Sequence, residues 1–399
     1  MTASADLAAL WPLDPAVTFL NHGSYGACPK AVLEHQAALR AELEAEPVLF
    51  LGRKLEERLD VARARLGEFV GADPGDLAFV TNATGGVNAV LRSLAFSPGD
   101  ELLTTDHCYA ACKNTLDYVA SRFGAKVNVA VVPFPLASPD EVVAAVLAKA
   151  TPKTKLALLD HITSPTALVL PIAKLVSELA ARGIDTVVDG AHGPGMVPLD
   201  LRALGAAYYT GNCHKWLCTP KGSAFLYVRR DRQAAIHPLT ISHGHVGERE
   251  GRTRFRLEFD WMGTSDPTAW LTVPMAIDYL GSLVPGGWPA LMARNRALAL
   301  EARGILQQTL GAAPVCPPEM VGSIASVRLP DSPLTNPKWR QPDPLQPRLF
   351  GEWGLEVPIM RWPGAPKRLV RVSCQLYNSL EQYVKLADAL RKELAAEPR

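Results

Sequence analysis

Lys215 is the first residue whose setting suggests chemistry, because it follows an apolar run within TGNCHKWL (210–217). An ammonium group beside a core strand is costly to bury without a partner. The cost is avoided if the amine is neutral, or if it is held as an imine with a carbonyl cofactor in a largely dry pocket. The alternative is a structural lysine that extends its charged end from a strand end to water. Taken alone, Lys215 leaves both interpretations open.

Asp189 is the second such residue, because it closes the apolar run of VVDGAHGPG (187–195). Its carboxylate needs a cationic or hydrogen-bond-donating partner, and a protonated pyridine nitrogen is one. That pairing keeps a pyridine ring an electron sink for a carbanion. His192 follows three residues later and is placed to pack on such a ring or to reach its phenolic oxygen. The alternatives are a turn-forming aspartate before Gly190 and a structural histidine.

A third segment, TNATGGVNAV (81–90), combines the end of an apolar run, a short turn and the start of a helical pattern. This layout offers free backbone N–H groups and the positive end of a helix to a phosphate. Thr84, Gly85 and Gly86 would make the contacts. The segment is neither a P-loop nor a dinucleotide-binding fingerprint, so a plain strand-to-helix turn is the alternative.

Short apolar runs that alternate with amphipathic helical patterns must position these three segments. The runs cover 77–82, 101–106, 126–134, 155–163, 184–192, 206–212 and 223–228, and the helical patterns cover 84–95, 111–124, 139–150 and 172–183. This alternation predicts an α/β fold with a mostly parallel central sheet and flanking helices. Ligands of such sheets bind beyond the carboxyl ends of the strands. Several runs end there in polar residues, namely Asn82, Asp106, His161 and Asp189.

The sheet pattern stops near residue 230, and the chain returns to short strands and helices only after a long helical region at about 266–310. We therefore predict three parts. Residues 1–45 form an N-terminal segment that packs with the small domain, 46–280 form the large cofactor-binding domain, and 281–399 form a smaller C-terminal α+β domain. The Pro-rich segment 330–347 is predicted to be an exposed loop.

Composition excludes several classes of partner. Forty-one basic and 40 acidic residues leave a net charge of +1, so neither nucleic acid nor a membrane is expected as a partner. Seven scattered cysteines without a zinc-like spacing indicate reduced thiols, and no run has the length of a transmembrane helix or the pattern of a signal peptide. These features favour a cytoplasmic protein.

Histidines give a weaker indication of a metal site. Five of them stand at 107, 192, 214, 243 and 245, and His243 and His245 have alternate spacing. No carboxylate is placed in the sequence to complete a typical ligand set, so no metal is expected.

The order of these segments resembles the fold-type I enzymes that use pyridoxal 5′-phosphate (PLP), and within them the class V aminotransferase-like family. The likeness runs over nearly the whole chain, through NHGSYGACP (21–29), NATGGVN (82–88), DHCYAA (106–111), DHITSPTALVLP (160–171), VVDGAHGPG (187–195), GNCHKW (211–216), WMGTSD (261–266) and LVRVSCQLYN (369–378). Within the family the chain is most similar to the isopenicillin N epimerase-like branch, which lies near cysteine desulfhydrases and other C–S lyases.

The resemblance implies a role for each matching residue. Lys215 would form the Schiff base with PLP and then carry the α-proton, Asp189 would hold the pyridine nitrogen, and His192 would lie near the phenolic oxygen. The phosphate would be bound by Thr84, Gly85, Asn212 and His214, and by Thr264 of the neighbouring subunit in a homodimer. The substrate would be bordered by Asn21 and Tyr25, and its α-carboxylate would be gripped by Arg371. Both His107 and Tyr109 are candidates for the ring that stacks on the cofactor, and we favour Tyr109.

The resemblance leaves the reaction open. Cysteine desulfurases carry a mobile cysteine where this chain has residues 356–368, which contain none, so persulfide chemistry is disfavoured. Cys374 is predicted to be a core thiol, and Cys213 and Cys218 flank Lys215 but have no base partner that the sequence can show. An epimerase, a β-eliminating lyase and an aminotransferase all pass through an external aldimine and a quinonoid.

We favour epimerase-like chemistry at the α-carbon of a small-molecule substrate that is an amino acid or derived from one. The alternative is a C–S lyase such as a cysteine desulfhydrase or a sulfoxide lyase, with an aminotransferase third. A protein that only binds PLP is disfavoured, because Lys215 and Arg371 are both retained and no DNA-binding pattern accompanies them.

Overall fold

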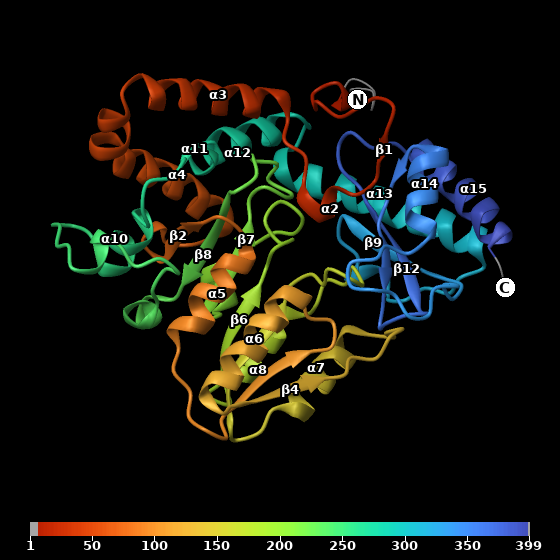
Figure 1. Cartoon of the computed structure of the whole chain (residues 1–399), viewed down its shortest axis with the longest axis horizontal. Coiled ribbons are helices and arrows are strands. Elements are labelled where there is room, and N and C mark those ends of the chain that lie inside the picture. The colour runs from red at the N-terminus through yellow and green to blue at the C-terminus, as the bar shows by residue number, and fades with distance from the viewer. Residues whose placement is uncertain (1–6, 398–399) are drawn as a thin grey trace.

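The computed structural model describes residues 7–397 and contains a seven-stranded central sheet (Figure 1). In spatial order the strands are β2 (Leu77–Val80), β8 (Ala224–Val228), β7 (Tyr208–Asn212), β6 (Asp185–Asp189), β5 (Thr154–Asp160), β3 (Glu101–Thr105) and β4 (Lys126–Ala130). Strand β8 is antiparallel to both of its neighbours, and all the other pairings are parallel. The predicted mostly parallel α/β sheet is therefore confirmed.

Alternate residues of each strand pack on opposite faces of the sheet. In β5, Leu156 and Leu158 join one buried cluster, whereas Ala157 and Leu159 join another. The first cluster contains helices α5 (Ala83–Ser93) and α6 (Ala110–Phe123), and the second contains α7 (Pro139–Lys149), α8 (Ile172–Ala180) and α4 (Leu55–Val70). Because both faces are covered, the strands read in sequence as continuous apolar runs.

The turn from β2 into α5 shows how the sequence sets the site's geometry. Asn82 is the N-cap of α5, and its side-chain oxygen accepts a hydrogen bond from the Gly85 N–H at 2.8 Å. A Cβ on Gly86 would lie 2.3 Å from Thr210 Oγ1 in β7, so a side chain there would push the helix off the sheet. Glycine at this position holds the first turn of α5 against the carboxyl end of β7.

The C-terminal region forms its own antiparallel sheet, in the order β11 (Ile359–Arg361), β12 (Arg368–Ser373) and β9 (Ile324–Leu329). Helices α13 (Gly287–Leu310), α14 (Leu345–Trp353) and α15 (Leu380–Ala396) accompany it. Helix α14 begins at Leu345, so the segment predicted as a loop over 330–347 ends three residues earlier than predicted, at residue 344.

The predicted N-terminal segment is shared between two regions. Strand β1 (Thr18–Phe19) pairs in parallel with β10 (Leu355–Glu356), and Figure 1 shows β1 beside the C-terminal elements. Helix α3 (Lys30–Ala45) instead contacts α11 (Thr268–Leu271) and α12 (Val273–Ser282). The boundaries 46–280 and 281–399 stay predictions.

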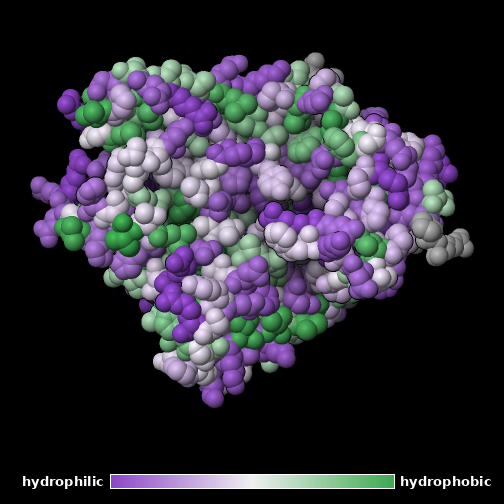
Figure 2. Space-filling view, in the orientation of Figure 1, coloured by the Kyte–Doolittle hydropathy of each residue, from purple (hydrophilic) through white to green (hydrophobic). Residues whose placement is uncertain are grey.

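The remaining elements are short. They are α2 (His22–Tyr25), η1 (Val48–Lys54), η2 (Pro74–Asp76), α9 (Leu201–Leu204), η3 (Arg230–Ala235), η4 (His243–His245), α10 (Arg254–Asp260) and η5 (Pro318–Met320). Among residues 7–397, none of the helices combines the length and apolar character needed to cross a bilayer. Polar residues cover much of the face seen in Figure 2, with apolar residues scattered between them.

Candidate active site

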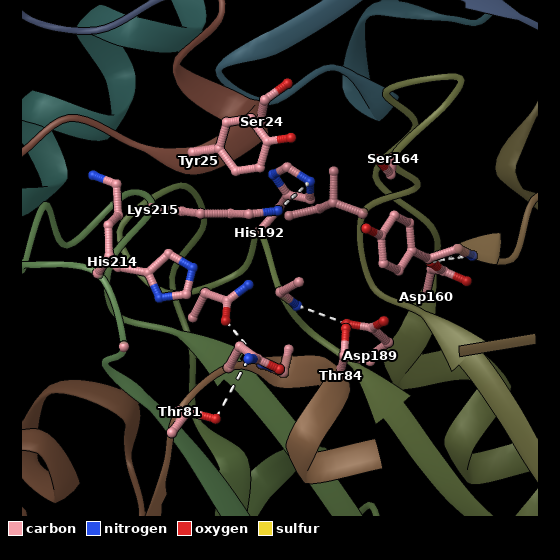
Figure 3. Close-up of a pocket in the computed structure, with 18 residues that line it drawn as sticks. Ser24, Tyr25, Thr81, Thr84, Asp160, Ser164, Asp189, His192, His214 and Lys215 are labelled. Carbon is pink, nitrogen blue, oxygen red and sulfur yellow. Dashed lines mark hydrogen bonds between the residues drawn. The ribbon is translucent and has the colours of Figure 1, made fainter. Parts of the chain in front are cut away.

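A cavity of about 600 Å³ opens at the carboxyl ends of the parallel strands (Figure 3). Its walls come from α2, the start of α5, the ends of β5, β6 and β7, and the loops that follow these strands. The lining includes Ser24, Tyr25, Thr81, Thr84, Tyr109, Asp160, Ser164, Asp189, His192, Asn212, His214, Lys215 and Lys221. The volume lies within the range of cofactor and ligand sites.

Lys215 and His192 contact each other in this cavity, with 3.2 Å between Nζ and Nε2. Trp216 Nε1–H donates to His192 Nδ1 at 3.3 Å, so a neutral His192 carries its proton on Nε2. That proton can be donated only to a neutral amine. Burial lowers the pKa of His192 and, with the charge of Arg371, lowers the pKa of Lys215 to about 8. The lysine is thus prepared as a nucleophile rather than as a permanent cation.

The N-terminal segment packs directly on the backbone of Lys215. Buried His22 accepts a hydrogen bond from Tyr377 Oη at 2.8 Å and donates from Nε2 to the Lys215 carbonyl at 2.9 Å. Gly26 has φ +73°, and a Cβ there would lie 2.0 Å from the His214 carbonyl oxygen. Only glycine combines that conformation with so close an approach. Sequence reasoning did not single out His22, and its only signal was its place in the NHGSYG segment.

Two carboxyl groups lie side by side at the strand ends, because Asp160 of β5 and Asp189 of β6 are register partners. Asp189 accepts hydrogen bonds from the Ala191 N–H at 3.0 Å and from Cys112 Sγ at 3.1 Å. In the described chain no lysine or arginine pairs with it. Asp160 accepts from the Tyr109 N–H at 3.2 Å, and its second oxygen is buried without a hydrogen-bond partner.

Burial, followed by the charge of Asp189, raises the pKa of Asp160 well above its ordinary value. Asp160 therefore holds its proton more tightly than an ordinary aspartate does. It was not predicted as a site residue, although the motif that begins with it was noted.

Asp160→Asn is expected to remove a pH-dependent cost in stability. Above pH 4 the unfolded chain releases the Asp160 proton while the folded chain retains it. Wild-type stability therefore falls as pH rises from about 4 to the raised pKa, by up to about 1.4 kcal/mol per pH unit. Urea unfolding of the cofactor-free protein between pH 4 and pH 8 measures this. The variant should gain stability over wild type as pH rises, whereas exposed Asp140→Asn should show no such trend. A pH-independent difference for Asp160→Asn would contradict the assignment.

The backbone N–H groups at the start of α5 differ in whether they are free to bind a ligand. Ala83 N–H donates to Asn212 Oδ1 at 2.8 Å, and Gly85 N–H is taken by Asn82. Thr84 N–H has no acceptor among the described residues, and Thr84 lines the cavity. Asn212 thus fixes the start of the helix, and Thr84 is the residue of this turn that can meet an anion.

His214 also lines the cavity. Its Nδ1–H donates to the Ser223 carbonyl at 2.9 Å, and burial lowers its pKa to about 4. The histidine is therefore neutral, with Nε2 available as an acceptor.

Arg371 of β12 is buried beside this cavity without a carboxylate partner in the described chain. Its Nη1 donates to the Ser164 carbonyl at 2.6 Å and to Ser164 Oγ at 3.1 Å, and its Nη2 donates to Ser24 Oγ at 2.9 Å. Ser24 in turn donates to Asn21 at 2.5 Å, and Asn21 donates to Glu356 at 3.1 Å. Arg371 Nε has no partner, and burial lowers the pKa of this guanidinium to about 10. Such a group calls for an anion.

The structure separates the two candidates for the stacking ring. Tyr109 lines the cavity and is 43% exposed, whereas His107 is 1% exposed and contacts Thr166 Oγ1 at 2.7 Å. His107 also packs against Trp362, with ring centroids 4.3 Å apart. Tyr109 is thus the one within reach of a bound molecule.

Gly85 and Thr264 line a second cavity of about 510 Å³ rather than the one that holds Lys215. The two cavities share Thr81, Lys221 and Gly222 as a common wall. Asn21 is buried behind Ser24 and Tyr25 stands at the cavity mouth, 75% exposed. The sequence predicted no role for Thr81, Ser164 or Lys221, although Thr81 and Ser164 lie within two of its motifs.

All seven cysteines are buried, and none is among the described residues that line the Lys215 cavity. Burial raises the pKa of Cys213 and of Cys374 to about 12. Cys218 is also held in the thiol form, since burial raises its pKa well above the ordinary value. No cysteine is therefore placed as a nucleophile here.

Residues 27–327 match the family Aminotransferase class-V. The chain belongs to that family. It is 38% identical to the isopenicillin N epimerase of Amycolatopsis lactamdurans, over 98% of both chains. It is 34% identical to a putative L-cysteine desulfhydrase of Oryza sativa subsp. japonica, over 96% of this chain and 84% of that protein.

Solved structures confirm the class-V fold. A cysteine desulfurase from Thermococcus onnurineus NA1 has a TM-score of 0.82 at 18% identity, with 100% of this chain and 99% of that chain covered. The protein C-DES, with glycine covalently linked to its PLP cofactor, has a TM-score of 0.79 at 22% identity, with 96% and 98% covered. The chain is a PLP-dependent, isopenicillin N epimerase-like enzyme of this family.

The cavity has residues that suit the pyridine nitrogen, the phosphate and the aldehyde of PLP. Buried Asp189 has no fixed cation among the residues that the structure describes, and a pyridinium would supply one, while the open N–H of Thr84 suits a phosphate. Lys215, with its lowered pKa, suits an aldehyde carbon. These are the residues that would hold the cofactor.

Proposed function

We propose that this class-V enzyme is an epimerase that inverts the α-carbon of an amino-acid-type substrate. The observation that carries the proposal is Arg371, a buried guanidinium that has no acidic partner among residues 7–397 and whose charge acts on Lys215. A substrate α-carboxylate would supply the missing anion and would place the α-carbon near the lysine.

Bound PLP would withdraw electrons from the substrate and so acidify its α C–H bond. Lys215 is suited to receive that proton, since a pKa lowered to about 8 makes its neutral amine accessible and His192 Nε2 lies 3.2 Å from it. His192 has no route to a second proton while Trp216 occupies Nδ1. Asp189 and Thr84 would orient the two ends of the cofactor without exchanging protons with the substrate.

Epimerisation needs a second proton carrier on the opposite side of the α-carbon, and Tyr109 is our candidate. Along the strand edge, Lys215 follows β7 and Tyr109 follows β3, so the two residues flank Asp189 and Asp160 on β6 and β5. Burial raises the pKa of Tyr109, so its phenol is protonated at neutral pH and can deliver a proton.

Tyr109→Phe is expected to stop inversion while sparing proton exchange on one side. In heavy water, wild type should incorporate deuterium with loss of chirality. The variant should incorporate deuterium with retention, and its epimerisation rate should fall about 10²- to 10⁴-fold. Chiral chromatography and mass spectrometry of L- and D-amino acids, and of isopenicillin N, measure both rates.

Tyr118→Phe is the matched control, because Tyr118 of α6 is exposed and is not among the described residues that line this cavity. It should leave inversion within about twofold of wild type. Equal losses of exchange and inversion in Tyr109→Phe would assign Tyr109 to cofactor binding instead.

A C–S lyase is the second candidate, because desulfhydrase relatives match 29–34% of aligned residues over most of this chain. Lys215 alone would suffice for proton removal before a leaving group departs from Cβ. Pyruvate and ammonia from L-cysteine, with no D-isomer formed, would favour this function over the epimerase.

We further propose that the enzyme is a homodimer in which Lys215 forms a Schiff base with PLP and Thr264 serves the partner's phosphate. The placement of Thr264 supports this, because it lies in the second cavity, on the far side of Thr81 and Gly222 from Lys215.

A further inference from the structure

A cluster of two histidines and one glutamate lies outside the Lys215 cavity, where the loop after β8 meets α10. Glu258 of α10 is 1% exposed, and its two oxygens contact His237 Nδ1 at 2.6 Å and His245 Nδ1 at 3.0 Å. The candidate ligand atoms all lie within 4.8 Å of one another. Figure 1 shows α10 at the end of the molecule away from the C-terminal elements.

The charge of Glu258 is unmatched by any permanent cation among the described residues. Its recorded ion pairs involve only His237 and His245, which are charged only when protonated. Arg254, on the same helix, donates instead to the carbonyls of Gly244, His245 and Gly247. Buried carboxylates are normally paired with a cation or bound to a metal, and a divalent ion would complete this set.

The backbone holds the three ligands in place before any ion arrives. A Cβ on Gly244 would lie 2.0 Å from the Leu257 carbonyl, so only glycine lets the η4 turn approach α10 this closely. Arg254 fixes the same turn, and Ser93 of α5 accepts from the His237 N–H at 2.9 Å. Each imidazole can lie against Glu258 without rearrangement of the chain, which favours binding.

We propose that His237, His245 and Glu258 form a zinc-type divalent metal site with one open position. Two imidazoles and a carboxylate suit Zn²⁺, which takes such ligands at about 2.0–2.2 Å and accepts water as the fourth. Each histidine would bind through Nδ1 and carry its proton on Nε2. No metal was expected from the sequence, where His243 and His245 stand at alternate positions without a carboxylate placed to complete the set. In the structure the carboxylate is Glu258, thirteen residues after His245, and the second histidine is His237 rather than His243.

The test is zinc titration of the PLP-loaded enzyme after dialysis against EDTA, in competition with a chromophoric chelator. Wild type should bind one Zn²⁺ per chain. His245→Gln, at a 52% exposed side chain, should weaken this at least tenfold, and Glu258→Gln should do the same. His243→Gln is the matched control, since His243 is exposed on the same turn and outside the cluster, and its affinity should equal wild type.

Co²⁺ gives a second readout. Bound to nitrogen and oxygen ligands, it should show visible d–d bands in wild type and in His243→Gln, but not in His245→Gln or Glu258→Gln. The cofactor's own absorbance in each variant reports that the fold is intact, and His245→Gln decides the matter if Glu258→Gln fails to fold. Absence of zinc binding in wild type would overturn the site and leave a hydrogen-bonded triad. Equal affinities in wild type and His245→Gln would overturn it as well.

Discussion

Lys215→Ala is expected to abolish turnover, by at least about 10⁴-fold, and to remove the visible absorbance of lysine-bound PLP. The reason is that Lys215 is the amine held by His192 at 3.2 Å with its pKa lowered to about 8. The measurement is the absorption spectrum from 300 to 550 nm of both proteins after incubation with PLP, followed by turnover of L- and D-amino acids.

Lys221→Ala is the control for this experiment. Lys221 lines the same cavity six residues later, but it also lines the second cavity and has no contact with His192 among the recorded hydrogen bonds. It should keep the lysine-bound band. Loss of the band in Lys221→Ala with retention in Lys215→Ala would move the Schiff base to the other lysine.

Arg371→Gln is expected to lower kcat/KM for amino acids about a hundredfold or more, chiefly through KM. Loss of a charge-assisted pair with the α-carboxylate costs about 3 kcal/mol, and glutamine retains donors for Ser164 without the charge. Steady-state kinetics measure the loss, and the band of lysine-bound PLP should still be present, because Arg371 contacts Ser24 and Ser164 rather than the residues assigned to the cofactor.

An amine that lacks the α-carboxylate tests whether Arg371→Gln removes recognition of the carboxylate or damages the site more generally. Wild type and Arg371→Gln should bind this amine with equal affinity, because the amine has no carboxylate for the guanidinium to bind. Arg328→Gln, on the neighbouring strand β9 and exposed, should leave amino-acid kinetics within twofold of wild type. A similar loss for the amine and the amino acid in Arg371→Gln would assign Arg371 a structural role.

The α/β architecture could be predicted because the sheet is covered on both faces. Burial on two sides makes β2 and β8 continuous apolar runs, and these run patterns are local properties of the chain. The division of the N-terminal segment could not be predicted, because pairing of β1 with β10 joins residues more than 330 positions apart. No local pattern in two residues encodes such a partner.

Some of the site residues could likewise be predicted from the sequence, and others could not. Asp189 ends a strand, and Lys215 and Thr84 follow strands. Parallel strands bring their carboxyl ends to one edge, so the convergence of these residues could be predicted from their order. The choice of Tyr109 over His107 depended on which side chain faces the cavity, two residues apart in one loop.

By itself, the sequence determined the family, the cofactor and the residues at the strand ends, because each is expressed in a short motif or in the order of motifs. The tertiary structure alone decided three further features. Burial and the strand register that sets Asp160 beside Asp189 raise the pKa of Asp160, the hydrogen-bond partners of Arg371 are Ser24 and Ser164 rather than an acid of the described chain, and Glu258 meets His245 because a glycine lets a turn approach its helix. In each case the electrostatic state depends on distances between segments remote in sequence, and those distances exist only once the chain is packed.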